Sequence, residues 1–279
     1  IESYNMSVSL QTLASSARFD HFSIIQISDL HLADAHSDTP LLDKVLQDLG
    51  NSTIPIDLIV VTGDLVQSID TAIYEKIFTK LDKLTIPYVC IAGNHDVTEE
   101  LDSHLPFEQR QHVAMSPHPR LKDNYTVMTP HWQLLFCDST VSGQIHGNFS
   151  NDTLAWLANQ LATAKKPCVL FCHHHVLPVH SGWIDAHITQ NHATFWQVIK
   201  PYSPTLSAIF TGHIHQEQNQ VYQGVAVYTV PSLCVQFLPF SDDFALDTEA
   251  KAGYRWITLY NNAKLATGVK RMDTTSPDY

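Results

Sequence analysis

The stretch LFCHHHVLP, residues 170–178, joins an apolar run to three consecutive histidines, His173, His174 and His175. The apolar run indicates a buried strand. Packing alone does not explain the histidines, because each ring nitrogen needs a partner once it leaves water. Successive side chains of a strand point to opposite faces, so the three rings cannot share one side. We therefore expect the end of this strand to use at least one of them for chemistry.

Four other strand-like runs end in residues of the same kinds. They are FSIIQIS before Asp29 and His31, IDLIVVTG before Asp64, PYVCIAG before Asn94, His95 and Asp96, and LSAIFTG before His213 and His215. Functional groups in open α/β sheets gather beyond the carboxyl ends of the strands. The sequence therefore predicts one site at which all five strand ends meet.

The residue types and their spacing point to metal ions. Asp29 and His31 are two residues apart, as are His213 and His215, so each pair can share a face. Carboxylate, amide oxygen and imidazole together suit zinc, iron and manganese, whereas an all-oxygen set favours magnesium or calcium. The candidate ligands are too many for one ion and suit two ions that share a bridging carboxylate. They are Asp29, His31, Asp64, Asn94, one of the three histidines, His213 and His215.

Between the strand-like runs, amphipathic patterns indicate helices. They are expected from Thr39 and Pro40 onward, around 73–84, near 152–164 and near 190–199. The first helix has a capping side chain, Thr39, and a proline at its first helical position. Residues 97–131 break the rhythm and are expected to be a polar connection, whereas the chain from VAVYTV onward looks more purely β. This alternation indicates two packed sheets, parallel or mixed, covered by helices.

The length of 279 residues is ample for one large domain with a buried core. We expect that domain to span residues 20–272, with an N-terminal extension at 1–19 and a C-terminal tail at 273–279. The sequence shows no low-complexity linker and no internal repeat that would divide it.

The composition describes a soluble globular protein, with 44% apolar and 16% charged residues. No apolar run approaches the roughly 18 to 20 residues of a membrane span, and IESYNMSVSL shows no secretory signal. The net charge of −12 repels polyanions and disfavours a nucleic-acid groove. Cys90, Cys137, Cys168 and Cys172 adjoin apolar strands, which favours reduced core thiols and a cytoplasmic location.

The motifs D-x-H, GD, GNHD, a histidine at a strand end and GHxH occur in that order, and the first candidate ligand of each is Asp29, Asp64, Asn94, His173 and His213. This order resembles the calcineurin-like metallophosphoesterase superfamily. The segments HHHVLPVHSGWIDAH and PSLCVQFLPFSDDFALD further resemble the bacterial 3′,5′-cyclic AMP phosphodiesterases of the class III cyclic-nucleotide group. The resemblance covers roughly residues 22 to 271 and implies a four-layer αββα sandwich, with two mixed sheets face to face and helices outside.

The resemblance also implies a centre of two divalent or mixed-valence metal ions, iron, manganese or zinc. In the family pattern, one ion is held by Asp29, His31 and His215, and the other by Asn94, His173 and His213. Asp64 bridges the two ions.

The implied reaction is a two-metal hydrolysis of 3′,5′-cyclic AMP to 5′-AMP. His95 is placed to donate a proton to the leaving ribose oxygen, and Asp96 to orient it or a neighbour. A broader phosphodiesterase acting on glycerophosphodiesters or 2′,3′-cyclic nucleotides is the alternative. We expect a small-molecule substrate, no nucleic acid or membrane, and a monomer or a homodimer. Substrate contacts are expected from Asn94, His95, His174, His175 and His187.

Overall fold

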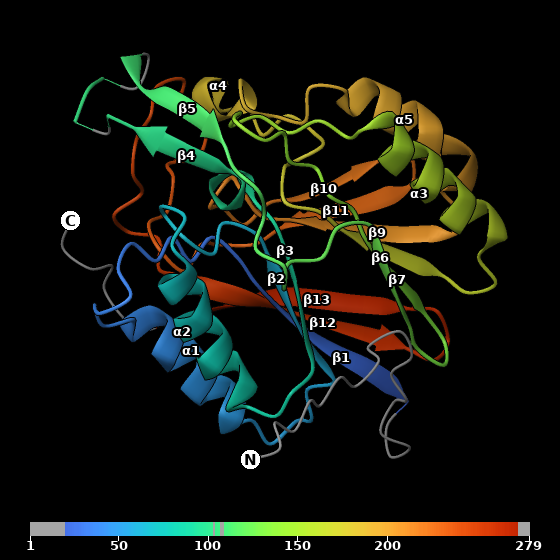
Figure 1. The fold of residues 1–279 in the computed structure, drawn as a ribbon. Helices are drawn as coiled ribbons and strands as arrows, with labels where there is room; N and C mark the ends of the chain where they lie inside the picture. Colours follow the sequence, from blue (N-terminus) through green and yellow to red (C-terminus); the bar gives the residue numbers. More distant parts are fainter. Residues whose placement is uncertain (1–19, 103, 107–108, 273–279) are drawn as a thin grey trace.

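Two β-sheets face one another, and helices lie on the outer side of each (Figure 1). The computed structural model describes residues 20–102, 104–106 and 109–272. The extension expected at 1–19 and the tail expected at 273–279 lie outside the described residues. One sheet has five strands and the other six, and a two-stranded sheet stands apart from both.

The five-stranded sheet contains the first strands of the chain. Its strands are β1 (His21–Ile27), β2 (Leu58–Thr62), β3 (Tyr88–Ile91), β12 (Gly253–Tyr260) and β13 (Leu265–Arg271). They lie in the order β13-β12-β1-β2-β3. β1, β2 and β3 run parallel, whereas β12 is antiparallel to β1 and to β13. The parallel strands are buried on both faces, which explains why they appear in the sequence as continuous apolar runs.

The six-stranded sheet contains the strand that ends in the three histidines. Its strands are β6 (Tyr125–Met128), β7 (Gln133–Phe136), β8 (Cys168–Phe171), β9 (Leu206–Thr211), β10 (Asn219–Tyr222) and β11 (Val225–Thr229). They lie in the order β10-β11-β9-β8-β7-β6. The four inner strands are parallel, and the edge strands β6 and β10 are antiparallel to their neighbours. Both sheets are therefore mixed, as expected.

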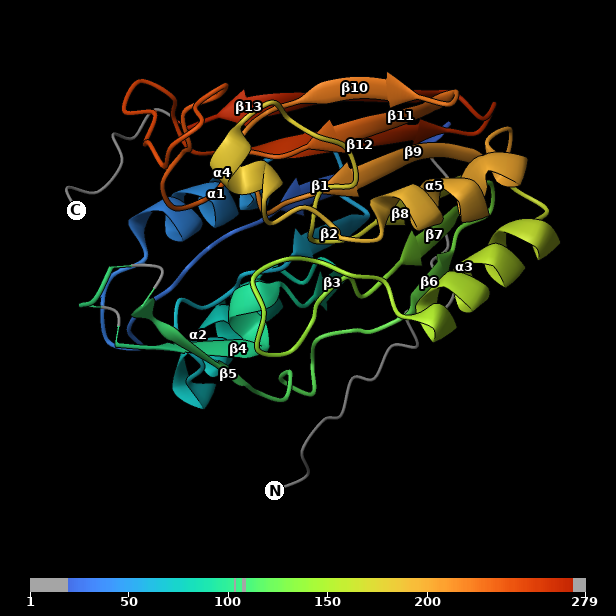
Figure 2. The ribbon, with the colours of Figure 1, turned by 90° about the horizontal axis from the view of Figure 1, so that it is seen from above.

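Four helices complete the layers. α1 (Pro40–Gly50) and α2 (Thr71–Asp82) cover the five-stranded sheet, and α3 (Asn151–Thr163) and α5 (His192–Ile199) cover the six-stranded one (Figures 1 and 2). Apolar side chains fill all three interfaces, one beneath each helix pair and one between the sheets. The expected four-layer αββα sandwich is confirmed. None of the helices in the described part of the chain has the length and apolar character needed to cross a bilayer.

A row of stacked aromatic rings fixes the register of the parallel strands in the six-stranded sheet. Phe136, Phe171, Phe210 and Tyr228 lie side by side on β7, β8, β9 and β11. Successive ring centroids are 5.2, 5.2 and 5.3 Å apart. Such cross-strand pairs stabilise one register over the alternatives. The row therefore fixes where β8 and β9 end, and with them the histidines that follow.

The sequence-based expectations were wrong in three places. Residues 97–131 are not only a connection, because they contain β6 and a hairpin of β4 (Thr98–Leu101) and β5 (Gln111–Ala114). β10 was not expected either. Thr39 precedes α1, but its hydroxyl donates to the Asp43 carboxylate at 3.0 Å instead of capping a backbone N–H.

Arg255 ties one sheet to the other. It lies on β12 and is 1% exposed, and its guanidinium donates to the Thr229 carbonyl on β11 at 2.8 and 3.0 Å. A further bond reaches Asn219 Oδ1 on β10 at 3.1 Å. Burial lowers the pKa of Arg255 to about 10, which still leaves it charged at neutral pH. A buried cation held by oxygens of the other sheet acts as a clamp at this edge.

Replacing Arg255 with methionine should destabilise the protein clearly. The Thr229 carbonyl would lose its donors, and a buried unsatisfied polar group costs about 1–3 kcal/mol. Urea denaturation would measure the free energy of unfolding. Arg120→Met is the matched control, because Arg120 is 40% exposed in its side chain and pairs with Asp82 at 3.0 Å. Such exposed pairs contribute about 0–1 kcal/mol. Equal losses in the two variants would contradict the clamp.

Candidate metal centre

The seven candidate ligands meet at one end of the sandwich, beyond β1, β2, β3, β8 and β9. Asp64 lies at the middle of the group. Its Oδ2 is 3.6 Å from His31 Nε2 and 3.3 Å from His173 Nε2. On one side, His215 Nε2 is 3.2 Å from His31 Nε2 and 3.4 Å from an Asp29 oxygen. On the other side, His173 Nε2 is 3.2 Å from Asn94 Oδ1.

The tautomers of these histidines turn lone pairs toward one another. His31, His173 and His215 each have Nδ1 within hydrogen-bond distance of an oxygen, so each ring, when neutral, donates from Nδ1 and carries its lone pair on Nε2. Those oxygens are Gln67 Oε1 at 3.0 Å, the Thr62 carbonyl at 2.7 Å and the Val235 carbonyl at 2.9 Å. His213 Nε2 is buried and has no hydrogen-bond partner among the described residues. This donor set fits metal ions, because imidazoles oriented by such bonds are typical ligands.

Charge in the centre is organised around Asp64. Burial alone would raise the pKa of Asp64, but His173 and His95 hold it well below its usual range. Burial also opposes charge on His173, yet Asp64 raises the pKa of that ring to about 9. Burial and the neighbouring His95 lower the pKa of His31 to about 3. The carboxylates thus demand positive charge at this point, from a proton on His173 or from a cation.

The backbone is strained where the ligands leave the strands. Five of the seven adopt a left-handed conformation that residues other than glycine rarely take. Their φ angles are 54° at Asp29, 43° at His31, 50° at Asp64, 68° at His213 and 51° at His215. Strained backbone of this kind gathers at functional sites. It turns each side chain back toward the common centre.

Space around the ligands is equally restricted. A Cβ on Gly93 would collide with the Asp64 carboxylate, so glycine is required before Asn94. The Asp29 carboxylate accepts the His213 backbone N–H at 3.1 and 3.2 Å, which joins a strand end of one sheet to a strand end of the other. The Asp64 carboxylate accepts the His95 N–H at 2.9 Å in the same way. These bonds fix the carboxylates before any ion binds.

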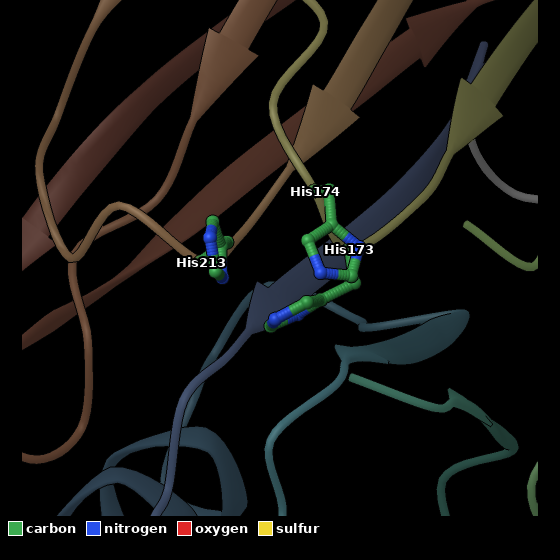
Figure 3. Close-up of side chains that lie close together, drawn as sticks. All are labelled: His173, His174 and His213. Atoms are coloured by element: carbon green, nitrogen blue, oxygen red, sulfur yellow. The ribbon is translucent and has the colours of Figure 1, made fainter. Parts of the chain in front are cut away.

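Figure 3 shows the rings of His173, His174 and His213 close together, and one nitrogen from each ring lies within 4.8 Å of the other two. Both nitrogens of His174 are engaged, Nδ1 with Ser139 Oγ at 2.9 Å and Nε2 with the Ile145 carbonyl at 3.0 Å. His173 Nδ1 faces the Thr62 carbonyl, whereas its Nε2 faces oxygens of two other candidate ligands, Asn94 at 3.2 Å and Asp64 at 3.3 Å. The geometry therefore favours His173 as the ligand and His174 as its buried neighbour.

His175 is buried on the other side of His213. Its ring stacks on His213 with centroids 5.6 Å apart, and its Nε2 lies 3.4 Å from an Asp185 oxygen. Asp185 ends α4 (Gly182–Asp185). Neither His174 nor His175 lines the pocket described below, and substrate contact by either stays a prediction.

His95 and Asp96 are the second and third residues of the short 3₁₀ turn Asn94–Asp96, and they differ in their surroundings. His95 Nδ1 is 3.0 Å from the Gln67 carbonyl, which orients the ring and leaves Nε2 for other partners. The Asp96 carboxylate is buried and accepts the Gly93 N–H at 2.8 Å and the Tyr74 hydroxyl at 2.7 Å. Burial and Asp64 raise the pKa of Asp96 to about 6. Asp96 thus holds backbone beside Asn94.

A pocket of 620 Å³ opens over the ligands. Asn94, His95 and His187 line it, which places these three expected substrate contacts at its surface. Its walls also include residues that the sequence analysis did not single out. Most of these are single polar or aromatic residues outside any motif, and such residues do not by themselves indicate a binding site. They are Gln67, Glu100, Arg110, Ile145, Asp243 and Phe244.

Residues 22–217 match the family described as calcineurin-like phosphoesterase. The chain belongs to this family. A probable cyclic nucleotide phosphodiesterase of Psychrobacter arcticus is 44% identical over 90% of this chain and 94% of its own length. Two proteins named 3′,5′-cyclic adenosine monophosphate phosphodiesterase CpdA are each 34% identical. The one from Vibrio vulnificus aligns over 92% of this chain and 93% of its own, and the one from Escherichia coli K12 over 90% of each.

Solved structures support the fold of this phosphoesterase. A dimetal phosphatase from Danio rerio has a TM-score of 0.56 at 14% identity, covering 88% of this chain and 98% of its own. A purple acid phosphatase from yellow lupin has a TM-score of 0.59 at 13% identity, covering 90% and 51%. The enzyme class expected from the sequence, a metal-dependent hydrolase of phosphoric diesters, is confirmed by the family and its relatives.

The left-handed backbone at His213 predicts that replacing this residue with glycine and replacing it with alanine will change the stability of the protein by different amounts. At this position glycine should be more stable than alanine by about 1 kcal/mol, because only glycine adopts φ of this sign without cost. Thermal denaturation of His213→Gly and His213→Ala in chelator would measure it. His175 is the control, since it has no positive φ, so there alanine should be the more stable. If alanine were the more stable replacement at both positions, the backbone at His213 would not be strained.

Proposed function

We propose that this phosphoesterase hydrolyses 3′,5′-cyclic AMP to 5′-AMP with two metal ions, iron, manganese or zinc. The observation that carries the proposal is the convergence of seven ligand side chains with their lone pairs facing one another. Asp64 contacts both histidine groups, as a bridging carboxylate would. The names of the relatives support cyclic AMP as the substrate, and the free cysteines agree with a cytoplasmic location.

The ligands divide into two sets around Asp64. Bound ions of this kind neutralise phosphate charge and acidify water for attack on phosphorus. The paired distances above support one set of Asp29, His31 and His215, and another of Asn94 and His173. His213 completes the second set in the proposal, with its unpartnered Nε2 as the donor atom.

His95 supplies the proton that the leaving ribose oxygen requires. It lines the pocket beside Asn94, and the Gln67 carbonyl holds its Nδ1 so that Nε2 exchanges the proton. Asp96 serves as a positioning residue, since its carboxylate is taken up by the Gly93 and Leu65 N–H groups and the Tyr74 hydroxyl.

Replacing His95 with alanine should lower turnover by about 10²- to 10⁴-fold, the usual range for loss of general acid catalysis. Metal content should stay near that of the wild type, because His95 lies outside both ligand sets. A diester with a 4-nitrophenolate leaving group should recover part of the rate, since that group needs little protonation. Loss of metal in the variant, measured by elemental analysis, would instead make His95 a ligand or a structural residue.

A substrate competition would test the reaction itself. Purified protein is stripped with chelator, refilled with manganese, iron or zinc, and given 3′,5′-cyclic AMP, 2′,3′-cyclic AMP, a glycerophosphodiester and DNA. We expect kcat/KM to be highest for 3′,5′-cyclic AMP and lowest for DNA, which the net charge of −12 repels. Tenfold faster cleavage of the glycerophosphodiester or the 2′,3′-cyclic nucleotide would overturn the substrate, while loss of all activity in chelator would still support the metal mechanism.

A further inference from the structure

Three aromatic side chains form a wall of the pocket beside the metal centre. We name Trp183, Phe237 and Phe244 the aromatic wall. The Trp183 ring meets Phe237 and Phe244 edge-on, with centroids 4.8 and 5.1 Å apart, and Phe237 and Phe244 are 5.7 Å apart. Because all three rings contact one another, they form one continuous surface and not scattered exposed residues.

The aromatic wall begins at the candidate ligands. The Phe237 ring lies flat on the imidazole of His215, with centroids 4.0 Å apart and planes 5° from parallel. Phe244 lies beyond, in contact with both other members of the wall. A ligand with its phosphate at the metal centre would therefore have its next chemical groups beside these rings.

The loop that carries Phe244 is held in place without covering it. The Leu238 N–H donates to the Ala245 carbonyl at 2.8 Å, and Gly182 of α4 leaves room for Asp242, an oxygen of which would lie 3.0 Å from a Cβ there. Yet Phe244 remains 62% exposed. Phe244 is a large aromatic side chain that lines a pocket and faces water. A ligand that covers such a side chain removes apolar surface from water, which favours binding.

The rest of the pocket wall is polar. Glu100 and Arg110 line it from the β4–β5 hairpin and form an ion pair at 3.0 Å. Figure 2 shows that hairpin and α4 apart from each other, with the strand ends between them. A ligand in this pocket thus meets aromatic faces on one wall and polar groups on another. A nucleobase has apolar faces and polar edges, whereas an alkyl chain or a glycerol has only one of these characters.

We infer that the aromatic wall is the nucleobase site of this enzyme, with Phe244 the residue on which the base stacks. This inference rests on the proposed function, because the phosphate is taken to lie at the metal centre. Stacking accepts any base, since every base has a π-face. The larger face of a purine covers more of the wall, so the site favours purine over pyrimidine cyclic nucleotides.

The test compares 3′,5′-cyclic AMP with the methyl riboside 3′,5′-cyclic phosphate, which has the same diester but no base. Their ratio of kcat/KM measures what the base contributes. In Phe244→Ala the ratio should fall by about 5- to 100-fold, the range for one stacked base. Phe244→Tyr, which keeps the ring, should preserve the ratio. Phe240→Ala is the matched control, because Phe240 lies in the same loop, is 71% exposed and does not line the pocket.

Binding of 5′-AMP, measured by calorimetry on the same metal-loaded variants, separates the inference from the proposed function. A higher Kd in Phe244→Ala alone supports the base site even if the wild type does not hydrolyse cyclic AMP, in which case only the proposed function fails. Unchanged ratio and unchanged Kd in Phe244→Ala would overturn the base site while cyclic AMP hydrolysis stands. Equal losses in Phe244→Ala and Phe240→Ala would also overturn it, because the effect would then come from the loop.

Discussion

The structure depends on a backbone constraint at the ends of its central strands. Asp29, His31, Asp64, His213 and His215 take left-handed conformations so that their donor atoms converge. Each such residue costs of the order of 1–3 kcal/mol, and it persists only where the surroundings fix it. Convergence adds a second cost, because carboxylates and imidazole lone pairs repel at these distances. Positive charge in the centre removes the repulsion and so offsets the backbone cost, which ties the strain to the chemistry.

The rigidity that fixes this strain comes from the sheets. The stacked row from Phe136 to Tyr228 holds four parallel strands in register, so the ends of β8 and β9 cannot slip past each other. Arg255 clamps the two sheets at one edge, and the bond from the His213 N–H to Asp29 joins them at the site. Each ligand set draws residues from both sheets, so a displacement of one sheet against the other would pull both sets apart. The hydrophobic layers and the metal centre are two consequences of one packing arrangement.

The sequence predicted those parts of the molecule that strong local patterns encode. The alternation of continuous apolar runs with amphipathic patterns, together with the family resemblance, predicted the layers. The metal-type residues at the strand ends predicted which side chains converge. The β4–β5 hairpin was missed because each of its strands has only four residues and neither forms a continuous buried run. Arg255 was missed because its partners lie on other strands. Glu100 and Arg110 reach the pocket only through tertiary contacts, so they carried no local signal, and Phe244 lies in a segment that only the family resemblance marked.

The two kinds of element divide the work of the site. Strand ends in the packed core carry the ligands, where a shift of a fraction of an ångström would matter. The pocket walls come from outside the core, from the β4–β5 hairpin, from α4 and from loops such as the one that carries Phe244. Such peripheral segments tolerate change better than the strands that support them. Phe237 is the exception, because its ring lies against His215 while it also forms part of the aromatic wall. A change at Phe237 would therefore disturb a ligand and the wall together. A change at Phe244 alters the wall and leaves His215 in place, so within this fold substrate preference can change while the metal chemistry is kept.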